Sequence, residues 1–405
     1  MIRCWRWILV LVCGAGIGPG SALGQIDPVK RELIQLGYNA AFEGHAPLSA
    51  YAFYYRNAPD FPGTNMTLRL AVAPTYLDSE LGFRNLLGEN TDLGIGIAGG
   101  GYADSYYEIR RGKYLPEESF DGYGGGGSVS LYHLFNPGYQ IPLNGVLRGT
   151  ARFVTYEATD NTDPRFQMPA HMGIFSVRSG LRWGGREPTL FPALAMELSV
   201  WYEGQFRTEG DIYGFGDRKV EPNSHLFWGE AFLAYTMPKW KHQFSISLLA
   251  GTSIDADRFS AYRLGGFLPM VSEFPLSLPG YYYQELSAKR FFLAGGNYTV
   301  PLDPGHRWNL NANAATALVN YLPGLEQPHQ WNSGVGGGVF YTSPSWRVMV
   351  GYGYGIDAIR SNGRGSHTIG FLLQLDLTPA KEAFFKAGQP GPWRGIQQIF
   401  GVFGS

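Results

Sequence analysis

The chain of 405 residues contains only two cysteines, Cys4 and Cys13. Beyond residue 13 it therefore cannot form a disulfide, a thiolate metal site or a cysteine nucleophile. Charged residues make up only 16% of the sequence, whereas ordinary soluble domains have about 25%. After residue 24 no apolar run reaches the roughly 20 residues that a membrane-spanning helix needs. These absences argue against a disulfide-stabilised domain and against a helical membrane protein.

The first 24 residues have the layout of a secretory signal peptide. Arg3 and Arg6 form a positive region, residues 8–17 are an apolar core, and residues 21–24 resemble the small-residue region that precedes a cleavage site. We predict cleavage after Gly24; an uncleaved anchor is the alternative. Cleavage removes two of the 32 basic residues and leaves 30 against 33 acidic ones. A mature net charge of about −3 argues against nucleic acid as a partner.

Glycine and aromatic residues are abundant, with 56 glycines, 25 tyrosines and 10 tryptophans. Many segments alternate between apolar and polar residues with a period of two, which is typical of β-strands. In the segment 193–206 one face carries Leu194, Met196, Leu198, Val200, Tyr202 and Phe206. The other face carries Glu197, Ser199, Glu203 and Gln205. Apolar side chains toward lipid and polar ones toward a lumen are the signature of a transmembrane β-barrel.

We therefore predict an all-β fold, a transmembrane antiparallel up-and-down β-barrel of 14–16 strands spanning residues 49–378. The expected strands are 50–57, 65–77, 91–103, 122–135, 145–157, 172–184, 192–207, 223–237, 242–254, 282–300, 307–319, 330–342, 345–355 and 367–377. The connection 77–90 is long enough to hide a further strand pair. A soluble β-sandwich or propeller is the alternative, but its surface would carry more Lys, Glu and Thr.

Two segments lie outside this pattern. Residues 25–48 are expected to form a periplasmic segment with a short helix, because Asp27 can cap a helix that has Pro28 at its first position. Residues 379–405 follow the last clear strand and are expected to form a C-terminal tail. The long connections 104–121, 158–171, 208–222 and 255–281 alternate with short turns, so they are predicted to be extracellular.

The longest of these connections continues to residue 290 as an apolar, glycine- and proline-rich loop. Its order is Gly265, Gly266, Phe267, a spacer, Pro279, Gly280, Tyr281, and then Glu285 and Leu286 opening a strand. So many apolar side chains would be an unusual patch in water. We therefore expect the loop to fold into the barrel lumen.

This order resembles the inward loop of the BamA-like bacterial surface-antigen superfamily of outer-membrane assembly factors and two-partner secretion translocators. The stretches "GVGGGVFYTSPSWRVMVGYGYG" and "HTIGFLLQLDL" resemble the last strands of those barrels. The best match is to the C-terminal barrel of patatin-like outer-membrane proteins, and it covers about residues 262–377. Neither the periplasmic POTRA domains nor a patatin domain is expected in this chain.

The resemblance also implies a lock between an arginine at the loop tip and an aspartate on a wall strand. Here Pro279 holds the arginine's position, and the wall strand offers only Asn309, Asn311 and Asn313. We therefore expect an apolar or hydrogen-bonded attachment of the loop. Tyr281 is predicted to lie against Asn309 and Asn311.

No motif supports catalysis, and the chain is predicted not to be an enzyme. The glycine runs lack the Lys-Ser/Thr of a phosphate loop, and the histidines lack zinc-site spacing. A lipid-acting barrel enzyme using His133 or His225 with a serine is a weaker alternative. No cofactor or metal is expected.

The most informative polar side chains are Arg178, Arg182, Glu197 and Glu203, which are predicted to face the lumen. They are either a ladder of structural cross-strand pairs or a lining that selects solutes. The expected location is the bacterial outer membrane, with membrane lipid and lipopolysaccharide as surroundings and the assembly machinery as a partner during biogenesis. A transport or translocation barrel is the leading hypothesis; a non-conducting structural or partner-scaffolding barrel is the alternative.

The period-two pattern predicts which side chains water can reach. Arg178 lies on the face opposite Phe175 and Val177, and a charge facing lipid at mid-depth would cost roughly 2–4 kcal/mol. Cysteines introduced at Arg178 and Glu197 should therefore react with water-soluble thiol reagents and resist lipid-phase reagents. The opposite labelling would invert the register of these strands.

Overall fold

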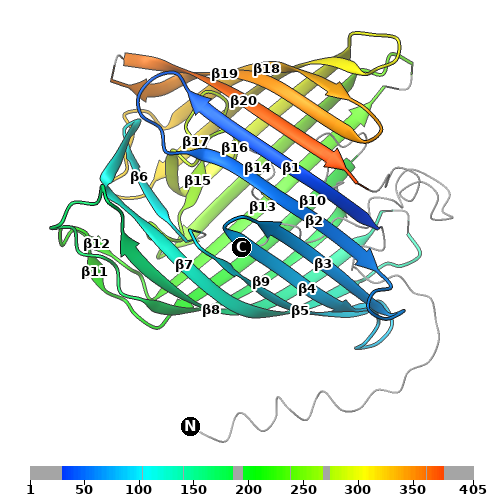
Figure 1. Cartoon of the computed structure of the whole chain (residues 1–405), viewed down its shortest axis with the longest axis horizontal. Helices are drawn as coiled ribbons and strands as arrows, with labels where there is room; N and C mark the ends of the chain where they lie inside the picture. Colours follow the sequence, from blue (N-terminus) through cyan, green and yellow to red (C-terminus); the bar gives the residue numbers. More distant parts are fainter. Residues whose placement is uncertain are drawn as a thin grey trace, which may run out of the picture.

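The computed structural model describes residues 30–377 apart from 103, 140, 186–194, 238, 268–273 and 362. The predicted signal peptide and the tail 379–405 lie outside this part of the chain. Within it no helix is long and apolar enough to cross a membrane. The described residues form strands joined by turns and loops, and they wrap around a central axis (Figure 1).

Sixteen strands build the wall of the barrel. They are β1 (Arg31–Ala41), β2 (Ser49–Pro59), β3 (Met66–Ala73), β4 (Tyr76–Phe83), β5 (Thr91–Gly100), β7 (Lys113–Leu134), β8 (Leu143–Ala158), β9 (Met172–Gly185), β10 (Ala195–Arg207), β13 (Asn223–Thr236), β14 (Gln243–Ile254), β16 (Leu286–Pro301), β17 (Trp308–Tyr321), β18 (Trp331–Thr342), β19 (Trp346–Arg360) and β20 (Gly363–Asp376). Short strands β6 (Tyr106–Arg110), β11 (Ile212–Tyr213), β12 (Arg218–Lys219) and β15 (Tyr262–Leu264) belong to the long connections.

Each wall strand pairs antiparallel with the next one along the chain, and the sheet then closes on itself. The closing pair is β1 with β20, in a register that runs from Leu33 opposite Asp376 to Ala41 opposite Thr368. Inside this seam the Gln35 amide donates a hydrogen bond of 2.9 Å to Gln374. The predicted up-and-down barrel is thus confirmed, at the upper end of the expected 14–16 strands.

The helix expected within residues 25–48 is wrong, because Arg31–Ala41 is strand β1. Leu33 and Gln35 are buried and point inward, while Tyr38, an odd number of residues away, is exposed. The Asp27–Pro28 capping signal is local, whereas β1 gains backbone partners on both β2 and β20. In hydrocarbon every backbone group must be paired, so this pairing outweighs helix propensity. The barrel begins at residue 31 rather than at 49.

The long connection 77–90 does contain a hidden strand. The segment expected as one strand over 65–77 ends at Ala73, a two-residue turn follows, and β4 runs back to Phe83. β3 and β4 are only eight residues long each. Figure 1 shows both ending well short of β2 and β7 at the end of the barrel where β6 lies.

The two faces of the wall have the composition expected in lipid. Along β10, Leu198 and Val200 are 52% and 57% exposed, while Glu197 and Ser199, which alternate with them, are buried. Similar exposed apolar side chains recur on β9, β14, β17 and β19. A soluble β-sandwich would bury the apolar face and expose the polar one, so the predicted barrel orientation accounts for this pattern and the sandwich does not.

The long connections gather at one end of the barrel and pack into a compact cap. Its apolar centre is a buried cluster of Tyr106, Phe120, Val154, Tyr156, Phe166, Met172, Ile174, Tyr213 and Val220. The buried Arg218 of β12 pairs with Glu118 on β7, and Asp163 N donates to Glu117 O at 2.9 Å. Burial raises the pKa of the Tyr213 phenol well above its ordinary value, so this group stays neutral in the cap.

The closed seam can be tested with an engineered disulfide. Leu36 lies opposite Leu373, and directly opposed residues have Cβ atoms about 4.5–5.5 Å apart. The double variant Leu36→Cys/Leu373→Cys should oxidise readily and change the mobility of the unfolded chain on a non-reducing gel. Leu36→Cys/Leu377→Cys, offset by four residues or about 13 Å, is the matched control. Equal oxidation of both pairs would contradict the register.

Candidate functional site

The candidate site is the barrel lumen, which is filled by the connection between β14 and β16. Residues 274–285 of this connection lie against the inner wall, and Leu278, Tyr281 and Tyr282 are at most 1% exposed. Leu278 and Tyr281 share a buried apolar cluster with wall residues Leu226, Leu249, Phe291, Leu293, Ala317 and Val319. The predicted inward fold of this loop is confirmed. Leu268, Met270 and Val271, also expected to tuck inward, lie outside the described residues.

The tip of the loop fits against a glycine-lined strip of the wall. A Cβ added to Gly334 on β18 would lie 2.1 Å from Pro279 O. A Cβ added to Gly280 would lie 1.7 Å from the backbone nitrogen of Gly355 on β19, and Gly280 also has a φ of +81°. Only glycine satisfies both the space and the backbone conformation here. The glycines of β18 and β19 are thus the surface on which the loop tip rests.

Phe267 makes a similar contact on the neighbouring strands. A Cβ added to Gly370 on β20 would lie 2.1 Å from the Phe267 ring, and one added to Gly351 on β19 would lie 2.8 Å from it. The ring also packs on a cluster formed by Phe340, Met349 and Leu372. The chain on either side of Phe267 is shaped by Gly265 and Gly266, which both have positive φ.

A buried ion pair attaches the far end of the loop to the wall. The Arg360 guanidinium donates from Nη1 and Nη2 to the two carboxylate oxygens of Glu285, at 2.8 and 2.9 Å. Both side chains are 1% exposed. Arg360 also lies 3.7 Å over the Tyr282 ring, and the Tyr282 hydroxyl donates to Glu43 O at 2.7 Å. A bidentate pair of this kind is among the stronger and more directional protein contacts.

The loop makes apolar contacts with the wall, as expected, but the expectation of an apolar or hydrogen-bonded attachment missed this ion pair. The chain has an arginine–carboxylate pair, but the arginine is on the wall and the carboxylate is in the loop. Tyr281 does not lie against Asn309 or Asn311 either. It clusters with Val319 and Tyr321, at the opposite end of β17. Glu285 and Arg360 are 75 positions apart in the sequence, so no local sequence pattern predicts their pairing.

The three asparagines of β17 make hydrogen bonds within the wall, near the end of the strand that follows the short turn from β16. Asn309 Nδ2 donates to His306 O and Arg307 O, and Asn311 Nδ2 donates to the Thr299 hydroxyl at 3.0 Å. Asn313 Nδ2 donates to Asn311 Oδ1 at 3.3 Å. They alternate with the exposed Trp308 and Leu310. They are placed on the inner face and do not touch the loop tip.

The four charged residues singled out in the sequence form two neighbouring ion pairs. Arg178 Nε and Nη2 each lie 2.7 Å from Glu203, its direct cross-strand partner. Arg182 Nε lies 2.9 Å from Glu197, and both side chains are nearly inaccessible. Arg182 also lies 5.0 Å over the Trp201 ring. Charges satisfied in this way have the arrangement of a structural ladder between β9 and β10.

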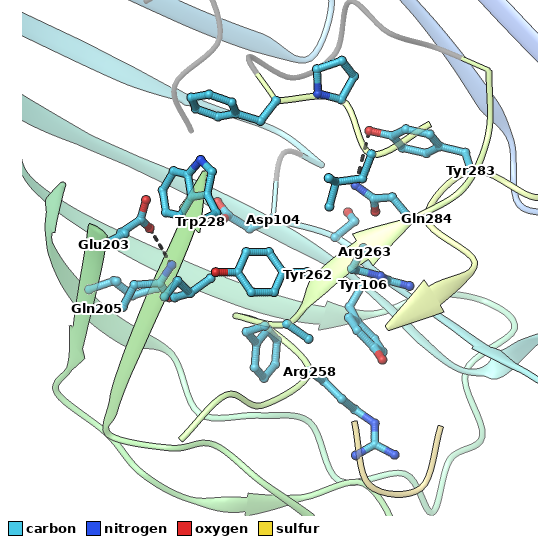
Figure 2. Close-up of a pocket in the computed structure, with 18 of the residues that line it drawn as sticks. Asp104, Tyr106, Glu203, Gln205, Trp228, Arg258, Tyr262, Arg263, Tyr283 and Gln284 are labelled. Carbon is cyan, nitrogen blue, oxygen red and sulfur yellow. Dashed lines mark hydrogen bonds between the residues drawn. The ribbon is translucent and has the colours of Figure 1, made fainter. Parts of the chain in front are cut away.

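A cavity of about 600 Å³ remains beside the loop. Figure 2 shows Glu203, Gln205 and Trp228 on one side of it and Arg263, Tyr106 and Gln284 on the other. Sequence reasoning identified Arg178 and Glu203 but missed Arg152, Arg207, Arg258 and Arg263, which also line it. Two of these, Arg258 and Arg263, come from the long connection, where strand alternation gives no signal.

The histidines considered for lipid chemistry bond elsewhere. His133 Nδ1 lies 2.9 Å from the Thr91 hydroxyl, and His225 Nδ1 lies 2.9 Å from the Tyr202 hydroxyl. Across the part of the chain that the structure describes, no group of three or more His, Cys, Asp or Glu side chains could hold a metal ion.

Comparison with known proteins relates this barrel to solved structures by fold. No protein-family model and no curated protein matches the sequence. CdiB from Acinetobacter baumannii superposes with a TM-score of 0.58 at 11% identity, covering 85% of this chain and 60% of that one. CdiB from Escherichia coli superposes with a TM-score of 0.57 at 10% identity, covering 85% of this chain and 63% of that one. BamA from Haemophilus ducreyi lacking POTRA domains 1–3 superposes with a TM-score of 0.53 at 12% identity, covering 85% of this chain and 70% of that one.

These neighbours support a BamA-like barrel fold. Because the identities are so low, the likeness is one of fold. The chain spans about three fifths of the length of the two CdiB structures. The finer resemblance to the barrel of patatin-like proteins stays a prediction.

The Glu285–Arg360 pair should stabilise the folded barrel. Arg360→Gln leaves a buried carboxylate unpaired, and breaking a buried pair costs about 3–5 kcal/mol. A clear drop in the thermal unfolding temperature in detergent is expected, and Glu285→Gln/Arg360→Gln should lose less because both charges are gone. Arg165→Gln, in the exposed pair with Asp163, is the matched control. An equally large drop in the unfolding temperature of the control would contradict a specific stabilising role of the buried pair.

Proposed function

We propose that this chain is an outer-membrane β-barrel of the surface-antigen type that transports or translocates a substrate when its inward loop is displaced. The observation that carries the proposal is the closed barrel whose lumen is obstructed by a loop that packs closely on glycines of the wall. The fold likeness to BamA and CdiB supports an outer-membrane setting. In this setting the signal peptide directs export, and membrane lipid, lipopolysaccharide and the assembly machinery are the surroundings.

The way the loop is attached favours a movable obstruction over a fixed core. The loop enters after Leu264 and leaves at Leu286, and both ends lie on neighbouring backbone positions of β15 and β16. Besides its apolar packing, its attachment to β18, β19 and β20 includes a few discrete contacts, namely the Glu285–Arg360 pair and the close packing on Gly334, Gly355 and Gly370. Contacts of this kind can be lost together, which is how a packed element switches between two states.

The second candidate function is a non-conducting structural or scaffolding barrel. It is favoured by the ladder of satisfied charges on β9 and β10 and by the compact cap of long connections. In this proposal the loop is a permanent core that stiffens the wall. Neither proposal requires catalysis, a metal or a cofactor.

Excision of the loop separates these functions. Gly265 N donates to Leu276 O at 2.9 Å and Leu278 N to Gly266 O at 3.2 Å, so the two arms already lie side by side. Deleting 267–279 and joining Gly266 to Gly280 therefore needs little rearrangement of the wall. In planar bilayers the deletion should raise single-channel conductance severalfold and lower thermal stability.

Deletion of the exposed turn 137–139, at the opposite end of the barrel, is the matched control and should conduct like the unaltered protein. A loop deletion that folds but conducts no better than this control would contradict the transport proposal and favour the scaffold.

A further inference from the structure

The cavity beside the inward loop has the size and lining of a ligand site. Its volume of about 600 Å³ lies within the range of roughly 300–1,000 Å³ that is usual for small-molecule pockets. Its lining comes from the barrel wall, from the cap, and from loop residues 274–277 and 283–284. It therefore lies where three parts of the fold meet.

Charge in the cavity is balanced except at one side chain. Four of the five arginines that line it pair with a carboxylate: Arg152 with Asp104, Arg178 with Glu203, Arg207 with Asp257 and Arg258 with Glu108, at N–O distances of 2.5, 2.7, 2.7 and 3.2 Å. The remaining lining carboxylate, Asp78, lies 3.8 Å from Arg69 on the adjacent strand. Among the described residues Arg263 has no carboxylate within ion-pair distance.

Arg263 is held in place by neutral groups. Its Nη2 donates to Tyr107 O at 2.7 Å, and its guanidinium carbon lies 4.9 Å from the centre of the Tyr106 ring. A guanidinium carries five donors and does not lose its charge in proteins. The cap thus fixes the orientation of Arg263, and no described carboxylate pairs with its charge at the cavity wall. An anionic group is the partner that such a site lacks.

Part of the remaining lining is apolar. Wall and loop contribute Phe53, Leu226, Trp228, Leu249, Tyr262, Phe274, Leu276 and Phe291. Trp228 and Phe274 pack edge to face, with ring centroids 5.5 Å apart. Arg263 at the cavity wall, together with these apolar side chains, suits a molecule with an anionic head and an apolar tail.

The cavity also adjoins the lowest part of the barrel wall. Ala71, Ala73, Tyr76 and Asp78, on both strands of the short β3–β4 hairpin, line it. β2 pairs with β3 from Tyr54 to Pro59, and β2 itself begins at Ser49, so it extends past the hairpin. β7 extends past it on the other side, from Gly124, its last pair with β5, to Lys113. On that side β6 pairs with β7 between Phe120 and Lys113, so the lowest part of the wall lies between β2 and the β6–β7 hairpin.

We propose that the cavity binds a single-tailed amphiphile with an anionic head, with Arg263 holding the head, and that the ligand passes over the β3–β4 hairpin. The proposal deepens the proposed transport function, because it names the class of substrate. Binding by the purified protein in detergent does not depend on transport, so the two can fail separately.

Binding can be measured with a dansyl-labelled undecanoate added to the purified full-length barrel in a non-ionic detergent. Saturable fluorescence enhancement is expected, and Arg263→Gln should weaken it about tenfold or more, as loss of a charge-assisted bond does. Arg263→Lys should recover part of the affinity. Arg165→Gln, which removes an exposed arginine of the same cap, is the matched control and should bind like the unaltered protein.

The head and the tail are tested by competition. Unlabelled dodecanoate should displace the probe, while acetate and inorganic phosphate, which lack a tail, and dodecanol, which lacks the charge, should compete poorly. Displacement by acetate or phosphate at similar concentration would mean a small-anion site and overturn the proposal. Equal affinity of Arg263→Gln and the unaltered protein, or equal competition by dodecanol, would also overturn it.

The path is tested at the hairpin. Ala73→Trp places a large side chain at the lowest part of the wall and should slow probe association severalfold. The same substitution at Ala312, which is exposed on the outer face of β17, should leave the rate unchanged. Unaltered association in Ala73→Trp would rule out passage over the hairpin.

Discussion

Closure of the backbone hydrogen-bonded sheet is the constraint on which the rest of this structure depends. In hydrocarbon an unpaired strand edge is not tolerated, so the first and last strands must meet. This requirement turns residues 31–41 into strand β1, despite a local helix-start signal, and sets the register of β1 on β20. Once the sheet is closed, its outer face must be apolar, and the lumen is the place left for charges and for the long connection.

The lumen is organised by pairing of charges rather than by an open water-filled pore. Arg178, Arg182 and Arg207 each lie against a carboxylate within 3 Å, which limits the desolvation penalty that an isolated buried charge would carry. The Glu285–Arg360 pair uses the same chemistry to hold a loop instead of a strand. One type of contact thus joins neighbouring wall strands and also holds the loop inside the lumen.

Glycine has a second role here besides allowing turns. Gly334, Gly351 and Gly370 lie on the inner face of β18, β19 and β20, where loop atoms occupy the space that side chains would fill. The glycines of the wall therefore leave the space that the loop atoms fill. By contrast, β3 and β4 are only eight residues long, and residues of both strands line the remaining cavity.

The sequence by itself determined the barrel class and the inner and outer faces of strands such as β10 and β17, because side-chain alternation is a local consequence of strand geometry. It also indicated the inward loop, because the apolar residues of that loop needed a place away from water. Tertiary structure alone decided the strand identity of residues 31–41, the pairing of Glu285 with Arg360 and the position of Arg263 at the cavity wall. Each of these depends on residues that are distant in the chain and become neighbours only when the sheet closes, so no local pattern contains them.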